Sequence, residues 1–131
     1  MKIIERQVAV ITGAASGIGL GIVNACAARN MRIIAADISL SRLESLSQDL
    51  QQRNIEHHIM VCDVADPAQV KALADLAYRQ YGVVNALFNN AGIMINGVSW
   101  QCSVADWQKV INVNFMGTVY GIQEFVPRML E

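Results

Sequence analysis

The sequence of 131 residues carries little charge and contains no long hydrophobic run. Charged residues make up 16% of it, the formal net charge is −1 and the Lys and Arg residues are scattered, so no basic patch favours nucleic acid or an anionic membrane. No apolar run reaches the length that spans a bilayer. The short, charged stretch Met1–Arg6 does not have the pattern of a secretory signal. We therefore expect a cytoplasmic protein with no nucleic-acid partner and no membrane partner.

The sequence also has little that favours disulfide or metal chemistry. Its three cysteines, Cys26, Cys62 and Cys102, are an odd number and lack a Cys-x-x-Cys spacing. We expect them to be small buried hydrophobic residues in a reducing compartment. The two histidines, His57 and His58, are neighbours in a predicted strand, where successive side chains point to opposite faces. They therefore cannot hold one metal ion together, and we predict no metal site.

Apolar residues, in contrast, make up 53% of the chain, which at this length predicts one domain with a substantial core. Helix patterns separate four apolar runs of strand length, at 8–11, 31–36, 55–62 and 83–88. The first run does not alternate between apolar and polar residues, as is typical of a parallel strand buried on both faces. The order β-α-β-α-β-α-β predicts an α/β fold with a parallel sheet, right-handed crossovers and helices on both faces.

Three of the predicted helices have recognisable features. Ser41 and Glu44 have the spacing of a capping box ahead of an apolar stripe, Leu43, Leu46 and Leu50. Asp66 and Pro67 form a typical helix start, and Gly82 is a suitable stop. Another helical stretch begins at Ser103 and ends in a predicted apolar face, made by Phe115, Val119, Ile122, Val126 and Met129 and widened by Val113, Met116, Tyr120 and Phe125. A helix this apolar is expected to have partners on two sides.

A glycine-rich turn and a helix start follow the first strand directly. The start of a helix leaves amide groups unpaired and carries partial positive charge, so this arrangement favours a phosphate group. We expect Gly13 to adopt a positive φ, Gly17 to let a diphosphate approach the backbone and Gly19 to let the helix pack closely on the strand. The spacing Gly-x-x-x-Gly-x-Gly differs from the commoner Gly-x-Gly-x-x-Gly, and such turns also occur for packing reasons alone.

Two further features extend this interpretation. Asp37 ends the second predicted strand 18 positions after Gly19, close to the spacing of about 20 residues at which an acidic residue binds the ribose of a dinucleotide. The alternative role for Asp37 is that of a turn or helix-capping residue. The segment 89–92, Asn-Asn-Ala-Gly, follows the fourth strand, at the edge where open α/β sheets bind ligands. On its own this segment is equally typical of a simple turn.

Taken together, five features resemble the short-chain dehydrogenase/reductase family in order and spacing. They are the segment 12–19, Asp37, the pair Asp63-Val64, the segment 89–92 and the segment 112–117. The resemblance spans the whole chain and implies a Rossmann-type three-layer αβα fold with strand order 3-2-1-4 in the part present. It further implies that 1–131 is an NAD(P)-binding domain, the N-terminal cofactor-binding half of an NAD-dependent oxidoreductase.

The resemblance also implies roles for individual residues. Those implied to bind the cofactor are Gly13, Ser16, Gly17, Ile18 and Gly19 at the diphosphate and adenosine ribose, Asp37 and Ile38 at the end of the second strand, Asp63 and Val64 beside the adenine, and Asn90, Ala91 and Gly92 along the nicotinamide side. Asn114 matches the helix asparagine that helps to hold a proton-relay water, and Asn112 is the weaker candidate.

The same residues predict a preference for NAD over NADP. Asp37 would face the 2′-phosphate of NADP with like charge and would lose the hydrogen bond from the 2′-hydroxyl. Members of the family that prefer NADP often carry a basic residue at the positions of Ser16 and Ile38, and neither is basic here.

The departure from the family concerns catalysis. Family enzymes carry a Ser and a Tyr-x-x-x-Lys pair, but none of Tyr78, Tyr81 and Tyr120 is followed by a lysine four positions on. We therefore expect a truncated dehydrogenase that binds its cofactor without turnover. A small alcohol or carbonyl substrate is expected only for the completed enzyme. The alternative is a non-catalytic NAD-binding or interaction module; a methyltransferase fits the glycine and asparagine motifs less well.

An open strand edge at Val83–Phe88 and the apolar helix at 115–129 predict self-association into a homo-oligomer.

Overall fold

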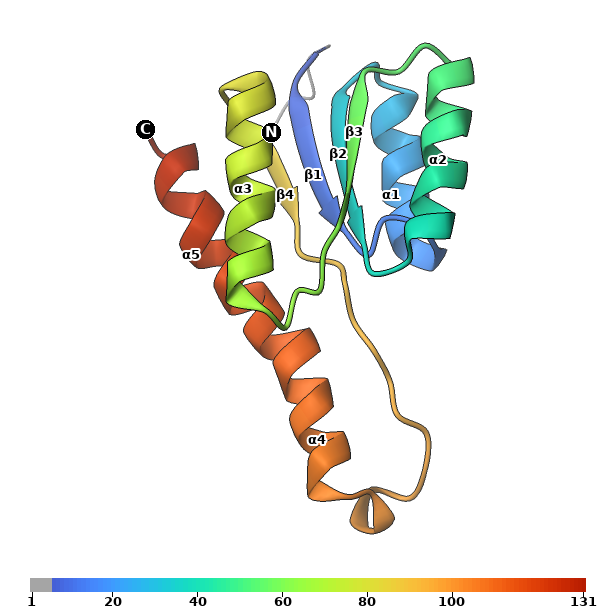
Figure 1. Cartoon of the computed structure of the whole chain (residues 1–131), viewed down its shortest axis with the longest axis vertical. Helices are drawn as coiled ribbons and strands as arrows, with labels where there is room; N and C mark the ends of the chain where they lie inside the picture. Colours follow the sequence, from blue (N-terminus) through green and yellow to red (C-terminus); the bar gives the residue numbers. More distant parts are fainter. Residues whose placement is uncertain (1–5) are drawn as a thin grey trace.

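A four-stranded parallel sheet forms the centre of the computed structural model, which describes residues 6–131 (Figure 1). Its strands are β1 (Val8–Thr12), β2 (Arg32–Asp37), β3 (His57–Val61) and β4 (Ala86–Phe88). The strand order β3-β2-β1-β4 confirms the predicted α/β topology. The segment 1–5, which holds most of the stretch tested above for a secretory signal, lies outside the described residues.

Helices cover both faces of the sheet, as predicted. They are α1 (Gly17–Ala27), α2 (Leu40–Gln52), α3 (Pro67–Tyr81), α4 (Val104–Val110) and α5 (Gly117–Met129). Figure 1 shows α1 and α2 on one side of the sheet, α3 and α5 on the other, and α4 extending away from it. A π-helical segment, Ile111–Met116, joins α4 to α5. Across 6–131 there is no helix with both the length and the apolarity needed to cross a bilayer, and the cytoplasmic location stays a prediction.

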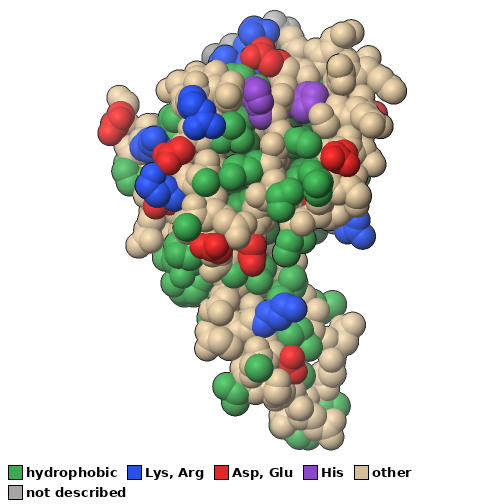
Figure 2. Space-filling view, in the orientation of Figure 1, with side chains coloured by type: hydrophobic (Ala, Val, Ile, Leu, Met, Phe, Trp, Pro, Cys, Tyr) green, Lys and Arg blue, Asp and Glu red, His purple; other side chains and the backbone are tan. Residues whose placement is uncertain are grey.

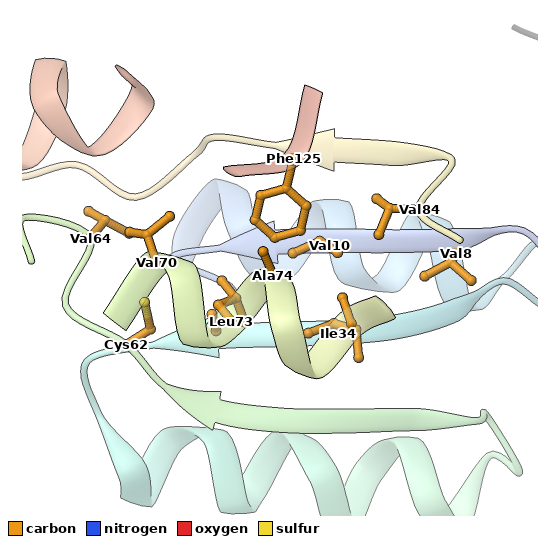
Figure 3. Packing of buried hydrophobic residues seen from close by; sticks show 12 residues of the cluster. Val8, Val10, Ile34, Cys62, Val64, Val70, Leu73, Ala74, Val84 and Phe125 are labelled. Atoms are coloured by element: carbon orange, nitrogen blue, oxygen red, sulfur yellow. The ribbon is translucent and has the colours of Figure 1, made fainter. Parts of the chain in front are cut away.

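The first strand contributes to both hydrophobic layers, which explains its unbroken apolar run. Val8 and Val10 pack with α3 and α5, whereas Ala9 and Ile11 pack with α1 and α2. Figure 3 shows the fully buried ring of Phe125 pointing from α5 toward Val10 and its neighbours on α3. Because both faces are covered, each strand residue of β1 is buried.

The structure confirms one predicted helix start and corrects another. The Asp66 carboxylate accepts a hydrogen bond from the amide of Ala68 at 2.9 Å, with proline at the next position, and α3 stops at Gly82 with a positive φ of 72°. Helix α2, however, is capped by Ser39, whose hydroxyl accepts from the amide of Arg42 at 3.4 Å. The predicted capping box at Ser41 is therefore wrong, because the helix has already begun at Leu40.

The predicted apolar face of the last helical stretch lies only partly in the core. Of its residues, Phe125 is fully buried and Val113, Tyr120 and Met129 pack against the core. Phe115, in the π-helical segment, is 65% exposed and Ile122 is 48% exposed, whereas Gly117 and Gly121 are buried. The physical reason is the close approach that the glycines allow. A methyl group at Gly117 would lie 2.7 Å from the Val64 side chain, and one at Gly121 would overlap the Asn89 amide. The helix therefore packs through these small residues and Phe125, and leaves Phe115 and Ile122 outside.

The two histidines do point to opposite faces. On the α2 side, the His57 Nε2 atom lies 2.7 Å from the Ser47 hydroxyl, and its Nδ1 atom lies 2.7 Å from the Ile55 carbonyl. On the α3 side, His58 makes an edge contact with the ring of Tyr81, with 5.6 Å between centroids. Within 6–131 no group of three or more His, Cys, Asp or Glu side chains is arranged to hold a metal ion.

Tyr81 provides a test of this packing. Its hydroxyl is buried without a hydrogen-bond partner among the described residues, and leaving such a group unpaired costs about 1–3 kcal/mol. We expect Tyr81→Phe to raise the free energy of unfolding by about 1 kcal/mol, because it removes the unpaired hydroxyl. The variant keeps the ring, and with it the contact with the Arg32 guanidinium, 5.0 Å from the ring centroid. Urea unfolding of the variant measures this, with Tyr120→Phe as the control.

The same variant should change the alkaline stability profile. Burial, followed by the charge of Glu56, raises the pKa of Tyr81 from 10.0 to about 12. The unfolded chain therefore loses this proton at a lower pH than the folded chain does. As a result, the contribution of Tyr81 to stability decreases as pH rises from 10 to about 12. Tyr81→Phe should remove that part of the decrease. A Phe variant that is less stable at neutral pH, or that shows the unchanged alkaline profile, would contradict this account.

Candidate functional site

A cavity of about 610 Å³ lies at the carboxyl ends of the strands, the edge at which open α/β sheets bind ligands. Of the residues that the sequence predicts to bind a cofactor, all but Gly19 line it: Gly13, Ser16, Gly17, Ile18, Asp37, Ile38, Asp63, Val64, Asn90, Ala91 and Gly92. The lining residues that the sequence analysis missed are Arg42, Cys62, Ala65, Ile93, Lys109 and Val113. The fold thus brings five separate segments of the chain to one cavity, at 13–18, 37–42, 62–65, 90–93 and 109–113.

The glycine-rich turn forms the wall of this cavity next to α1. Gly13 and Gly17 both adopt a positive φ, 63° and 53°, as the turn requires. Ser16 stands at the N-cap of α1 in extended conformation, and its side chain makes no capping hydrogen bond. The first amides of α1 therefore lack a side-chain acceptor, and they carry the partial positive charge of the helix start. This arrangement fits a phosphate group.

Gly19 lies beneath the turn instead of lining the cavity. A methyl group at this position would overlap the carbonyl oxygen of Gly13 and would lie 2.6 Å from the Asn90 amide nitrogen. The absence of a side chain therefore lets α1 cross closely over the end of β1. The close packing predicted for Gly19 is present in the structure.

The hydroxyl of Thr12 connects the end of β1 to the turn after β4. Its oxygen accepts hydrogen bonds from the amides of Asn90 and Ala91, both at 3.1 Å, and lies 3.3 Å from the Phe88 carbonyl, to which it donates. In return, the Asn90 side-chain amide donates to the carbonyls of Thr12 at 3.0 Å and Gly13 at 3.3 Å. Thr12 is part of the sequence motif, but no spacing rule predicts this bridge.

Asp37 has the turn role that the sequence left open, and its role in binding a ribose stays a prediction. It is only 8% exposed; one carboxylate oxygen accepts from the Ala15 amide at 3.0 Å and the other from the Ser39 amide at 3.0 Å. It is therefore a turn residue, yet it also lines the cavity. Because both oxygens are held by backbone amides, the carboxylate presents a fixed set of acceptor positions to a ligand.

The turn after β3 forms another part of the cavity wall. Asp63 accepts from the Ala65 amide at 2.9 Å, and its own amide donates to the Gln69 side chain at 2.8 Å. Burial, followed by the charges of Asp63 and Asp66, raises the pKa of Cys62 to about 11. The thiol is therefore protonated at neutral pH and unsuited to nucleophilic chemistry.

The predicted burial of the cysteines holds for two of them. Cys26 and Cys62 are buried, whereas Cys102 is partly exposed, with its sulfur 3.6 Å from the Val98 carbonyl. The reason is its place in the loop before α4, which extends away from the sheet (Figure 1). All three are free thiols.

Asn114 lies in the π-helical segment and holds the backbone next to the cavity. Its side-chain oxygen accepts from the Ile93 amide and its side-chain nitrogen donates to the Ile93 carbonyl, both at 2.8 Å. Asn112 instead accepts from the side chain of Gln108, at 2.8 Å on the exposed side of the helix. Asn114 thus touches a lining residue without lining the cavity itself, and its role in a proton relay stays a prediction.

Comparison with known proteins agrees with this geometry. The family model described as short chain dehydrogenase matches residues 7–131. The chain belongs to the short-chain dehydrogenase/reductase family. It is 37% identical to D-threitol dehydrogenase of Mycolicibacterium smegmatis and 35% identical to a 3-oxoacyl-[acyl-carrier-protein] reductase of Thermotoga maritima. Each alignment covers 98% of this chain, but only 49% and 52% of the respective relatives, so the chain spans about half their length.

Solved structures of this family superpose closely on the chain. A short-chain dehydrogenase/reductase from Burkholderia phymatum, crystallised in complex with NAD, is 39% identical with a TM-score of 0.96. The match covers 99% of this chain and 46% of that protein. Levodione reductase is 28% identical with a TM-score of 0.91, over 97% of this chain and 50% of the reductase.

Two glycines of α1 offer a matched test of the close packing under the turn. A methyl group at Gly21 would meet nothing within 4 Å, unlike one at Gly19. We expect Gly21→Ala to stabilise the protein by about 0.5–1 kcal/mol through the higher helix propensity of alanine. Gly19→Ala should destabilise it by about 1–3 kcal/mol or more, because the backbone around Gly13 has to move. Urea unfolding of both variants measures the difference; equal effects would refute the packing argument.

Proposed function

We propose that this chain is the cofactor-binding half of an NAD-dependent oxidoreductase that transfers a hydride between nicotinamide and an alcohol or carbonyl carbon. The observation that carries the proposal is the convergence of the glycine-rich turn, Asp37, Asp63 and the segment 90–92 on one cavity at the strand ends. Membership of the short-chain dehydrogenase/reductase family and the NAD complex of one relative support it.

The residues present fit a dinucleotide in both shape and charge. The start of α1 with Ser16, Gly17 and Ile18 would hold the diphosphate, and the Asp37 carboxylate would accept hydrogen bonds from the adenosine ribose. Asp63 and Val64 would border the adenine, and the segment 90–92 would extend along the nicotinamide side. When bound, a nicotinamide dinucleotide supplies the hydride acceptor or donor. The chain itself supplies binding, orientation and a fixed acceptor at Asp37.

The preference for NAD is part of the proposal and is testable by titration. Because the Asp37 carboxylate is held in place by two backbone amides, it cannot turn away from a 2′-phosphate without losing them. We expect NAD to bind more tightly than NADP by about 1–3 kcal/mol, roughly 5- to 150-fold. Competition titrations of the purified chain with both dinucleotides measure this ratio. Equal affinities, or tighter binding of NADP, would overturn the assignment of Asp37.

Catalysis by this chain alone is not expected. Protonation of the substrate oxygen by a positioned acid typically contributes about 10²–10⁴-fold to the rate, and none of Tyr78, Tyr81 and Tyr120 lines the cavity. Tyr78, for instance, donates its hydroxyl to the Phe125 carbonyl at 3.3 Å. We therefore expect binding without turnover in an absorbance assay with secondary alcohols and NAD, or carbonyl compounds and NADH. Turnover that disappears in the Asp37→Ala variant would show that this view is wrong.

Self-association is the second part of the proposal. Trp107, Ile111, Phe115 and Ile122 are exposed along α4, the π-helical segment and α5, and strand β4 pairs only with β1 among the described strands. Figure 2 shows hydrophobic side chains and few charges on the protruding lower part of the molecule. Exposed apolar patches and open edges recruit partners, so we expect dimers or larger species in light scattering. This expectation is contradicted if the unmodified chain is a monomer at high concentration and the Phe115→Lys variant has the same size.

A further inference from the structure

Gln69, in the first turn of α3, makes a contact that helix capping does not account for. A glutamine at the third position of a helix ordinarily accepts a hydrogen bond from the amide of the N-cap residue, which here is Asp66. In this chain the Asp66 amide donates to the Asp63 carbonyl at 3.1 Å instead. The Gln69 side chain extends further back along the chain, and its oxygen accepts from the Asp63 amide at 2.8 Å.

The nitrogen of the same side chain fixes its orientation. It donates to one carboxylate oxygen of Asp66 at 3.1 Å, and the other oxygen of Asp66 accepts from the Ala68 amide at 2.9 Å. A backbone amide needs an acceptor and a carboxylate needs donors, so this placement of the Gln69 oxygen and nitrogen satisfies both neighbours. The side chain of Gln69 therefore connects the backbone of Asp63 to the start of α3.

The carboxylate of Asp63 is held through one oxygen only. That oxygen accepts from the Ala65 amide at 2.9 Å. Between residues 6 and 131, this carboxylate forms no other hydrogen bond and no ion pair. Because Asp63 lines the cavity at the strand ends, its second oxygen is available to a ligand bound there.

We infer that Gln69 is a positioning residue for recognition of the base: it holds the backbone of Asp63 so that the second carboxylate oxygen accepts a hydrogen bond from the amino group of adenine. The inference rests on the proposed function, in which Asp63 borders the adenine. An ionised carboxylate can only accept hydrogen bonds. This position therefore favours a purine with an amino group at C6, as in adenine, over one with a carbonyl oxygen there, as in hypoxanthine.

The competing role for Gln69 is purely structural, as part of the cap of α3. In that role, its replacement would lower stability and would weaken every dinucleotide by the same factor, because apparent affinity scales with the fraction of competent protein. The positioning role predicts a selective loss of discrimination between the bases. The ratio of two affinities, measured on one preparation of the variant, separates the roles even where part of that preparation is unfolded.

The test is calorimetric titration of the full chain with NAD and with its deaminated analogue, in which hypoxanthine replaces adenine. The unmodified chain should bind NAD about tenfold more tightly, because the analogue replaces a hydrogen bond to a charged acceptor with two facing acceptors. Gln69→Met keeps the length of the side chain without its amide group, and should reduce this ratio to about twofold or less. Gln80→Met, at an exposed position of the same helix, is the matched control and should keep the ratio.

A change at Asp63 tests the same contact from the side of the acceptor. Asp63→Asn keeps an oxygen for the Ala65 amide and places an amide nitrogen, which is a donor, where the second carboxylate oxygen was. This variant should bind the deaminated analogue more tightly than NAD, by about two- to tenfold. Adding Gln69→Met should bring the two affinities together again, because the backbone of residue 63 is then no longer held.

The inference and the proposed function fail on different results. A ratio that Gln69→Met leaves unchanged, or an Asp63→Asn variant that still prefers NAD, would overturn the inference. Equal binding of the two dinucleotides by the unmodified chain would also overturn it, while dinucleotide binding itself would stand. If the unmodified chain binds neither dinucleotide, the proposed function itself fails.

Discussion

The hydroxyl of Thr12 joins the end of β1 to the end of the edge strand β4, where the cavity opens. Parallel strands end at a common edge, and the backbone groups beyond their last ladder bonds need other partners. Thr12 satisfies the amides of Asn90 and Ala91, and the Asn90 side chain satisfies the carbonyls of Thr12 and Gly13. Asp37 does the same for the glycine-rich turn through the Ala15 amide. The polar groups that shape the cavity are therefore the groups that close the end of the sheet.

Small residues set how closely the helices approach this edge. Gly19 lets α1 pass over the Gly13 carbonyl, while Gly117 and Gly121 let α5 lie against Val64 and Asn89. In each case a single added methyl group would collide with backbone or with a side chain of the strand ends. The cavity and the hydrophobic core thus share walls, and a change in either is expected to alter the other.

Local patterns in the sequence predicted most of the sheet and of the cavity, and long-range contacts decided the rest. The unbroken apolar run before Gly13 and the offset to Asp37 depend on near neighbours, so both features were predictable. The start of α2 was not predictable in this way, because Ser39 and Ser41 are both suitable N-cap residues. Ser39 is the N-cap in the structure, and its amide donates to the Asp37 carboxylate. The packing face of α5 was predicted from apolar spacing, yet Gly121 determines it through a contact with a distant strand end. Arg42 was missed for a similar reason: its place beside the cavity depends on where α2 begins.

The central claim is that a nicotinamide dinucleotide binds at the carboxyl ends of these strands. Backbone-amide NMR of the isotope-labelled chain, titrated with NAD, tests this residue by residue. We predict saturable shifts at 13–19, at 37–39, at 63–65 and at 90–93. The amides that line a separate groove between α1 and α2, such as those of Ser45 and Asp49, should stay unchanged. No saturable shifts, or shifts confined to that groove, would contradict it.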